Sequence, residues 1–329
     1  MSKTEKEILT ELDEDLAAFI AETKKFDLAD ADHAQDGTGE DAPLHLIILR
    51  AAFDTMARHF SEGVHANQPQ KQLEISDVLI GEVACRLYAS SAEPRARVLY
   101  LHGGGFVLGS LESHDAICAD IASRTGLTVI SADYRLAPEH PQPAAFEDCL
   151  NVYQAMESDS AIPILLAGDS AGAYLAAQLG LHLRDAPRPA DGLMLIYPAL
   201  GYDIETPSMI EMAHAPLLTT EAMAFYLESY AGGSLPDQHR PLPPLMEADL
   251  SGLPPVYISS ARYDPLASDA ALFAARLKQA DLQVSYQEEP KLVHAHLRAR
   301  HSVQAAKSAF EWICSGLMEL TDKALQNKG

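Results

Sequence analysis

Residues 164–177 read Ile-Leu-Leu-Ala-Gly-Asp-Ser-Ala-Gly-Ala-Tyr-Leu-Ala-Ala, and the rest of the chain is organised around this stretch. Ile164 to Ala167 form an apolar run of strand length between a proline and a glycine, which predicts a buried strand. From Ala171 onward, small residues and leucines keep a helical period. The chain therefore turns from strand to helix within residues 168–172, Gly-Asp-Ser-Ala-Gly.

A serine at the apex of so tight a turn adopts a strained backbone conformation and crowds the residues two positions away. Gly168 and Gly172 relieve both clashes. The Ser170 hydroxyl is then exposed at the carboxyl end of a sheet, beside a helix amino terminus whose free N–H groups favour developing negative charge. Ordinary Ser-Gly loops share this pattern, so other residues must decide whether Ser170 is a nucleophile.

Composition bounds the class of protein. The chain has 329 residues, of which 47% are hydrophobic, so it can bury a large core in one domain with insertions. Its formal charge is −23, from 24 basic and 47 acidic residues. Nucleic acids and anionic membrane surfaces repel such a charge, so we expect neither as a partner.

Cysteine usage and the amino terminus indicate a compartment. The four cysteines are far apart and include no Cys-x-x-Cys pair, which predicts buried thiols rather than a disulfide framework or a zinc site: Cys85, Cys118, Cys149 and Cys314. The charged amino terminus has no apolar signal-peptide core, and no apolar run approaches about 20 residues. We therefore expect a cytoplasmic protein.

Strand and helix patterns alternate along most of the chain. The expected strands are Leu73–Leu79, Val83–Tyr88, Ala96–Leu101, Leu127–Ala132, Ile164–Ala167, Leu193–Ile196, Val256–Ser260 and Val284–Gln287. The first two are expected to be antiparallel. The later alternation with helices predicts an α/β fold, with a mostly parallel sheet and helices on both faces.

Two regions outside this alternation predict a helical cap. Residues 5–25 and Leu44–Phe60 have helical spacing and precede the first strand. The alternation stops again between Pro198 and Pro255, where one good helix is expected at Thr220–Tyr230, followed by prolines at 241, 243 and 244. An insertion of that length above a sheet is more often a lid than disorder.

These patterns divide the chain into three parts. We expect an N-terminal helical cap segment at residues 1–70 and a cap insertion at residues 199–250. Residues 71–198 and 251–329 are expected to form the catalytic domain.

A glycine-rich loop follows the strand that ends at Leu101. Residues 102–106 are His-Gly-Gly-Gly-Phe, and successive glycines leave backbone N–H groups uncovered. Such groups can point at an oxygen that becomes negative during acyl transfer. A plain flexible loop fits less well, because apolar residues on both sides hold this one in place. The predicted oxyanion donors are the N–H groups of Gly104, Gly105 and Ala171.

Four motifs in order resemble the bacterial hormone-sensitive-lipase-like esterases of the α/β-hydrolase superfamily. They are His-Gly-Gly-Gly-Phe at 102–106, Asp-Tyr-Arg-Leu-Ala-Pro-Glu-His-Pro at 133–141, Gly-Asp-Ser-Ala-Gly at 168–172 and Asp-Pro-Leu at 264–266. The resemblance runs from about Leu73 to Trp312. It implies an α/β-hydrolase fold of about eight strands with a helical cap. It also implies a serine carboxylesterase that cleaves short-chain acyl esters through an acyl-serine, with no cofactor and no metal.

The resemblance also implies the partners of Ser170, because the superfamily order is Ser, then Asp or Glu, then His. Asp264 matches the family's Asp-Pro-Leu motif, whereas Asp269 is expected to begin the next helix. His294 aligns with the family's His-Gly-Phe, although this chain has Ala and His at the next two positions. A shift of two residues would make His296 the base instead.

Further side chains are expected to have supporting roles. The resemblance implies that His102 orients the glycine loop by hydrogen bonding. Arg135 and Glu139 are candidates for a buried charged network beneath the site, with exposed pairing as the alternative. Several residues of the cap segments either close the acyl pocket or belong to the core: Phe53, Met56, Phe60, Tyr202, Phe225, Tyr226 and Tyr230.

Two other functions remain compatible with these motifs. An amidase or formamidase uses the same serine machinery, since the three residues do not encode the leaving group. The second alternative is a protein that binds a ligand without catalysis, as in plant hormone receptors of the family that lost the catalytic histidine. The histidines at positions 294 and 296 argue against this alternative. The partner expected in every case is a small molecule, and a homodimer is compatible with the sequence.

Overall fold

The computed structural model describes residues 2–26, 42–61, 73–90, 93–157, 162–201, 204–233, 245 and 248–328. The proline-rich segment at 241–244 and Tyr202 lie outside these residues, as do parts of both predicted cap regions. The predicted division into a cap and a catalytic domain therefore stays a prediction.

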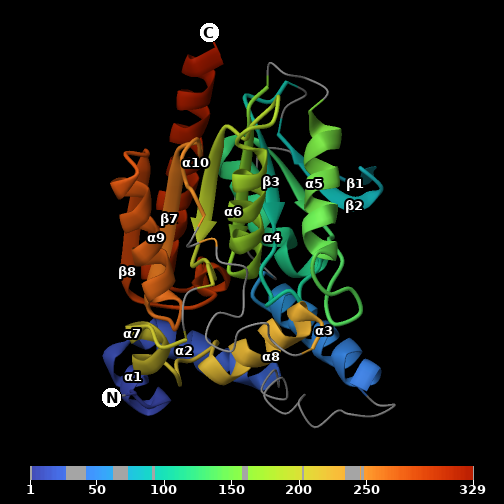
Figure 1. Ribbon diagram of the computed structural model, residues 1–329. Helices are drawn as coiled ribbons and strands as arrows, with labels where there is room; N and C mark the ends of the chain where they lie inside the picture. The colour runs from blue at the N-terminus through green and yellow to red at the C-terminus, as the bar shows by residue number, and fades with distance from the viewer. Residues whose placement is uncertain are drawn as a thin grey trace.

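One eight-stranded sheet forms the centre of the molecule (Figure 1). Its strands are β1 (Glu74–Ile80), β2 (Val83–Ala89), β3 (Arg97–Leu101), β4 (Thr128–Ala132), β5 (Ile164–Asp169), β6 (Gly192–Ile196), β7 (Val256–Tyr263) and β8 (Val284–Val293). The strand order is β1-β2-β4-β3-β5-β6-β7-β8. Strand β2 runs antiparallel to both neighbours, and all other neighbouring pairs are parallel. The predicted fold class is confirmed.

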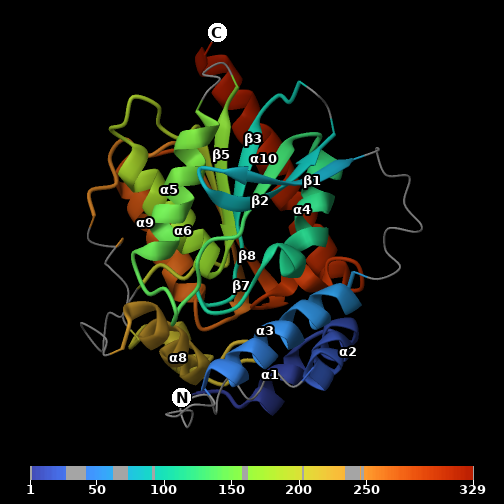
Figure 2. The same ribbon diagram turned by 90° about the vertical axis from the view of Figure 1, so that its right-hand side faces the viewer.

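Helices cover both faces of the sheet (Figure 2). On one face pack α5 (Ala144–Met156), α6 (Ala171–Leu183) and α9 (Ala267–Gln279). On the other pack α4 (Leu111–Thr125) and α10 (Gln304–Lys328). Every residue of β4, β5 and β6 is buried, as expected for parallel strands covered on both sides. This burial explains why the sequence showed continuous apolar runs there.

Among the described residues, five further helices gather at one end of the sheet, and we call them the cap helices (Figure 1). They are α1 (Glu5–Glu11), α2 (Glu14–Thr23), α3 (Ala42–His59), α7 (Pro207–Glu211) and α8 (Thr220–Ala231). Leu46 and Leu49 of α3 pack on Val107 and Leu108, directly after the glycine loop. Among the described residues, no helix is both long and apolar enough to span a bilayer.

Several elements differ from the sequence predictions. The single helix expected at residues 5–25 is broken, because Leu12 and Asp13 are extended between α1 and α2. Helix α7 was not predicted. Strand β8 continues to Val293 instead of ending near Gln287, and its pairing with β7 shifts register near Ala261.

The turn between β5 and α6 is as tight as its glycines predicted. Ser170 has φ 54° and ψ −119°, a backbone conformation that residues other than glycine rarely adopt. A Cβ atom added to Gly172 would lie 1.9 Å from the carbonyl oxygen of Leu101. One added to Gly168 would lie 2.5 Å from the carbonyl carbon of Gly172. These glycines let α6 approach the end of β3, and so bring Ser170 beside the glycine loop.

We expect Gly172→Ala to lower the free energy of unfolding by about 3 kcal/mol or more, because the new methyl group collides with backbone that cannot rotate away. Urea unfolding followed by circular dichroism measures the loss. Gly180→Ala in the same helix is the matched control, because its nearest contacts are the terminal methyl groups of Leu193. That variant should remain within about 1 kcal/mol of the unmodified protein. Equal stability of the two variants would contradict the packing described for α6.

Candidate active site

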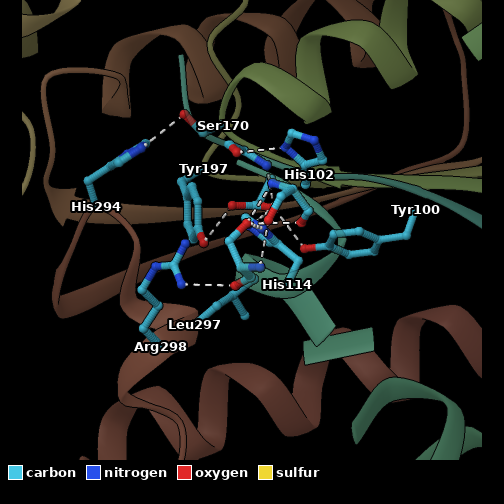
Figure 3. Close-up of polar contacts among 12 residues, drawn as sticks. Tyr100, His102, His114, Ser170, Tyr197, His294, Leu297 and Arg298 are labelled. Atoms are coloured by element: carbon cyan, nitrogen blue, oxygen red, sulfur yellow. Dashed lines mark hydrogen bonds and ion pairs between the residues drawn. The ribbon is translucent and has the colours of Figure 1, made fainter. Parts of the chain in front are cut away.

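Three residues far apart in the sequence meet at the carboxyl ends of the parallel strands. His294 Nε2 lies 3.0 Å from Ser170 Oγ (Figure 3), and His294 Nδ1 lies 2.7 Å from Asp264 Oδ2. Ser170 follows β5, Asp264 follows β7 and His294 follows β8. Asp264 is 1% exposed and His294 is 6% exposed, so the contact between these two side chains is shielded from water. The structure thus brings the three predicted residues together.

The hydrogen bonds assign the tautomer of His294. Asp264 is held in place because its Oδ1 accepts the backbone N–H of Leu266 at 2.8 Å. Its Oδ2 faces His294 Nδ1, and a carboxylate only accepts, so the proton of the neutral imidazole is on Nδ1. Nε2 then presents a lone pair to the Ser170 hydroxyl. This is the arrangement that a general base needs.

The two alternative residues are occupied elsewhere. Asp269 lies in the first turn of α9, where its Oδ2 accepts the N–H of Leu200 at 2.9 Å. His296 donates from Nδ1 to the carbonyl of Val293 at 3.1 Å. Within the described residues, His294 is the imidazole that hydrogen-bonds to Ser170 Oγ.

The predicted oxyanion donors line the same cavity as Ser170. Gly104 and Gly105 have φ values of +128° and +63°, which only glycine adopts readily. Within the described part of the chain, their N–H groups bond to no protein acceptor. Ala171 is the first residue of α6, where helix geometry leaves the N–H without a partner in the helix. Three N–H groups are therefore available near the serine oxygen.

The cavity over Ser170 has about 700 Å³ of open space, including the part that opens to solvent. Its walls are mainly apolar and come from the sheet edge and from α3 and α8. They include Phe53, Phe106, Leu108, Ala199, Leu217, Leu218, Met223, Tyr226, Leu227 and Leu266. An apolar cavity with a few convergent polar groups is typical of a small-molecule site.

Only some of the residues proposed for the acyl pocket reach this cavity. Phe53 and Tyr226 line it. Met56 is buried in the core, and Phe60 packs on Phe19 with ring centroids 4.5 Å apart. Tyr230 stacks on Phe106 at 3.9 Å. Phe225 packs beside α3, and Tyr202 lies outside the described residues.

The predicted buried network of Arg135 with Glu139 is wrong. The Arg135 side chain is 43% exposed and pairs with Asp148 at 2.8 Å. Glu139 pairs instead with Arg50 of α3 at 2.7 Å. The Glu139 pair is exposed, because α3 brings Arg50 over this segment, whereas Arg135 is partly exposed and pairs with the buried carboxylate of Asp148. His102 does contact the glycine loop, with its Nδ1 3.0 Å from the carbonyl of Gly103.

A buried polar cluster beneath Ser170 was missed by the sequence reasoning. Its centre is Asp169, whose carboxylate is contacted by Tyr100, His114 and Tyr197 (Figure 3). Arg298 lies beside this cluster and lines the cavity. The position of Tyr197, immediately after β6, was a usable signal, since side chains after parallel strands share one edge of the sheet. No sequence pattern pointed to His114 or Arg298.

The described residues contain no group of three or more His, Cys, Asp or Glu side chains arranged to hold a metal ion.

This fold, with a serine, a carboxylate and a histidine after three of its strands, defines the class of α/β hydrolases. A family model described as the alpha/beta hydrolase fold matches residues 98–298. The chain belongs to this family.

Named relatives refine this assignment. Esterase LipI of Mycobacterium tuberculosis is 34% identical over 302 residues, covering 83% of this chain and 94% of the relative. Carboxylesterase NlhH of the same species is 37% identical over 222 residues, covering 64% and 70%. A solved esterase of Pyrobaculum calidifontis is 30% identical with a TM-score of 0.75, covering 84% and 93%. The predicted resemblance to bacterial esterases of this superfamily is confirmed.

The buried histidines predict a pH dependence of stability. Burial lowers the pKa of His102 to about 3 and that of His296 to about 4. In the unfolded chain a histidine titrates near about 6.5, so below that pH the unfolded state binds protons that the native state does not. Each such histidine therefore lowers the free energy of unfolding by about 1.4 kcal/mol per pH unit as the pH falls from 6.5 toward its native pKa.

Urea unfolding at pH 8, 6 and 5 measures this slope. His296→Phe removes one of these groups and should flatten the slope between pH 6 and 5 by about 1.4 kcal/mol per unit. An unchanged slope in this variant would show that His296 is protonated in the native protein.

Proposed function

We propose that this protein is a serine carboxylesterase that hydrolyses short-chain acyl esters through an acyl-serine intermediate. The observation that supports this most strongly is the continuous chain of contacts from Asp264 through His294 to Ser170, beside three available N–H groups. The names of the relatives, esterase and carboxylesterase, support a carboxylic ester as the substrate.

In the proposed first step, Ser170 Oγ attacks the ester carbonyl carbon while His294 Nε2 takes the hydroxyl proton. Asp264 stabilises the imidazolium and keeps its ring oriented. The carbonyl oxygen becomes negative and accepts hydrogen bonds from Gly104, Gly105 and Ala171. The C–O bond to the alcohol breaks, and the alcohol leaves with the proton from His294.

The second step releases the acid. Water enters beside the acyl-serine, and His294 Nε2 takes one of its protons as the oxygen attacks the acyl carbon. The tetrahedral intermediate uses the same N–H groups, and its collapse returns the proton to Ser170 Oγ. The enzyme is regenerated without any oxidant or other co-reactant.

The cavity walls support a preference for short acyl chains. Tyr226 of α8 packs directly on the glycine loop, since a Cβ atom added to Gly105 would lie 2.3 Å from the Tyr226 ring. Leu218, Met223 and Leu227 close the space around it. We propose that these side chains limit the length of the acyl chain that fits in the cavity.

A p-nitrophenyl ester series from C2 to C12 tests acyl length. We expect kcat/KM to be highest between C2 and C6, because longer chains meet the α8 side chains. A maximum at C10 or C12 would overturn the short-chain proposal.

Comparing p-nitrophenyl acetate with p-nitroacetanilide tests the leaving group, and faster cleavage of the anilide would favour an amidase.

Single variants test the roles of the three residues. Ser170→Ala should lower kcat by at least about 10⁴-fold, because no nucleophile remains. His294→Ala should cause a loss of similar size. His296→Phe is the matched control, because it introduces the residue that the family usually has at this position. Its kcat should stay within about threefold of that of the unmodified protein, the size of effect expected for the loss of one hydrogen bond. If His294→Ala retains activity and His296→Phe loses it, the base is assigned wrongly.

We also propose that the protein acts in a reducing compartment such as the cytoplasm. The support is that its four cysteines are all buried free thiols. Burial raises the pKa of Cys85 to about 12, so this thiol is unreactive at neutral pH. Detection of the activity in the periplasmic rather than the cytoplasmic fraction of cells would contradict this location.

A further inference from the structure

We infer that Asp169, the neighbour of Ser170, is a positioning residue of the reaction. Its carboxylate holds the glycine loop through the N–H of Gly103 and supports the His294 imidazole through Tyr197, while Arg298 offsets its charge. This inference rests on the proposed esterase function and assigns three residues beyond the nucleophile, base and oxyanion donors.

The first arm of this cluster holds the glycine loop. The N–H of Gly103 donates to Asp169 Oδ1 at 3.0 Å. The carbonyl of Gly103 faces His102 Nδ1 at 3.0 Å, so the buried neutral imidazole carries its proton on Nδ1 and donates. A Cβ atom on Gly103 would lie 2.4 Å from Asp169 Oδ2, which explains the glycine. With both polar groups of Gly103 held, the direction of the next two N–H groups is set.

The second arm supports the base. The hydroxyl of Tyr197 donates to Asp169 Oδ2 at 3.2 Å. The centroid of its ring lies 4.8 Å from that of His294, so the ring borders the imidazole (Figure 3). Tyr197 has φ +34°, a strained value for a residue with a side chain, and its N–H donates to Ser259 at 2.6 Å. Strain at such a position is often retained where it fixes a functional side chain.

The two remaining donors complete the shell of the carboxylate. Tyr100 donates its hydroxyl to Oδ1 at 2.8 Å, and His114 Nε2 lies 3.3 Å from the same oxygen. Burial acts to raise the pKa of Asp169, but the contacts with His114 and Tyr100 and the charge of Arg298 outweigh it. The net effect holds the pKa below its usual range, so the side chain is charged at neutral pH.

A buried carboxylate beside the oxyanion site would by itself oppose the negative charge that develops there. Arg298 offsets this effect. It is 7% exposed, its Nη1 donates to the carbonyl of Ser113 at 3.1 Å, and its guanidinium lies 4.4 Å from the ring of Phe53. Among the described residues, no carboxylate lies within ion-pair distance of this guanidinium, so its charge acts on Asp169 across space.

The direct test is Asp169→Asn, which keeps the size of the side chain and an acceptor for Gly103 but removes the charge. We expect kcat for p-nitrophenyl acetate to fall about 100-fold, the size of effect that small misplacements of reacting groups produce. KM should change little, because the loop geometry that Asp169 holds is used mainly by the oxyanion of the transition state. Tyr197→Phe, which removes one hydroxyl from the carboxylate, should lower kcat about tenfold.

A second readout separates positioning from a structural role. A trifluoromethyl ketone forms a tetrahedral adduct on the serine whose oxyanion needs the glycine loop. Its inhibition constant should rise in Asp169→Asn in parallel with the loss of kcat/KM. Tyr257→Phe is the matched control, because it removes a hydroxyl that donates to Glu319, on the face of the sheet covered by α10. That control should keep kcat within twofold.

Arg298→Gln tests the countercharge. Alone it should lower kcat about tenfold, whereas in the Asp169→Asn background it should cause no further loss, because there is no charge left to offset. Multiplicative losses in the double variant would overturn the role of Arg298.

Unchanged kcat in a folded Asp169→Asn protein would overturn the role of Asp169. If Asp169→Asn does not fold, unchanged kcat in Tyr197→Phe overturns the inference. Inactivity of the unmodified protein and of Tyr257→Phe would instead refute the esterase proposal.

Discussion

The close approach of α6 to the end of β3 is the constraint on which the site depends. Only because Gly172 has no side chain can it lie against the carbonyl of Leu101, the last residue before the glycine loop. This contact brings Ser170, at the start of α6, beside the loop N–H groups. The strained backbone of Ser170 is the local cost of the arrangement, and the buried strand and helix on either side maintain it.

The carboxyl ends of the parallel strands gather the other groups at the same edge. Asp264 and His294 follow β7 and β8, and the Asp169 cluster joins the neighbouring strands β3, β5 and β6 beneath them. The polar groups of the site are therefore held mainly at the ends of sheet strands, whereas the cap helices α3 and α8 supply part of the apolar walls. This division separates the chemistry from substrate selection: changes in α3 or α8 can alter which ester fits without moving the reacting groups.

Local sequence patterns predicted the parts of this structure that depend on neighbouring residues. All eight strands were found, because each is an apolar or alternating run, and the motifs identified the three residues that meet at Ser170. Patterns failed where distant side chains decide the structure. Arg50 forms an ion pair with Glu139, which lies 89 positions further along the chain, and no periodic pattern in the sequence predicts that pair. Strand β8 was cut short because Glu288 and Lys291 look like a loop, although an edge strand can carry such charges into water. The Asp169 cluster draws on several separate elements, so only the folded chain reveals it.

The central claim is that His294 activates Ser170 as the nucleophile, and covalent labelling with a fluorophosphonate followed by peptide mass spectrometry tests it most directly. The account predicts one adduct per chain, on the peptide that contains Ser170, with labelling slowed at least about 100-fold in His294→Ala, as loss of a general base requires. Labelling of His296→Phe should proceed at the unmodified rate. An adduct on any other residue, or undiminished labelling of His294→Ala, would contradict the account.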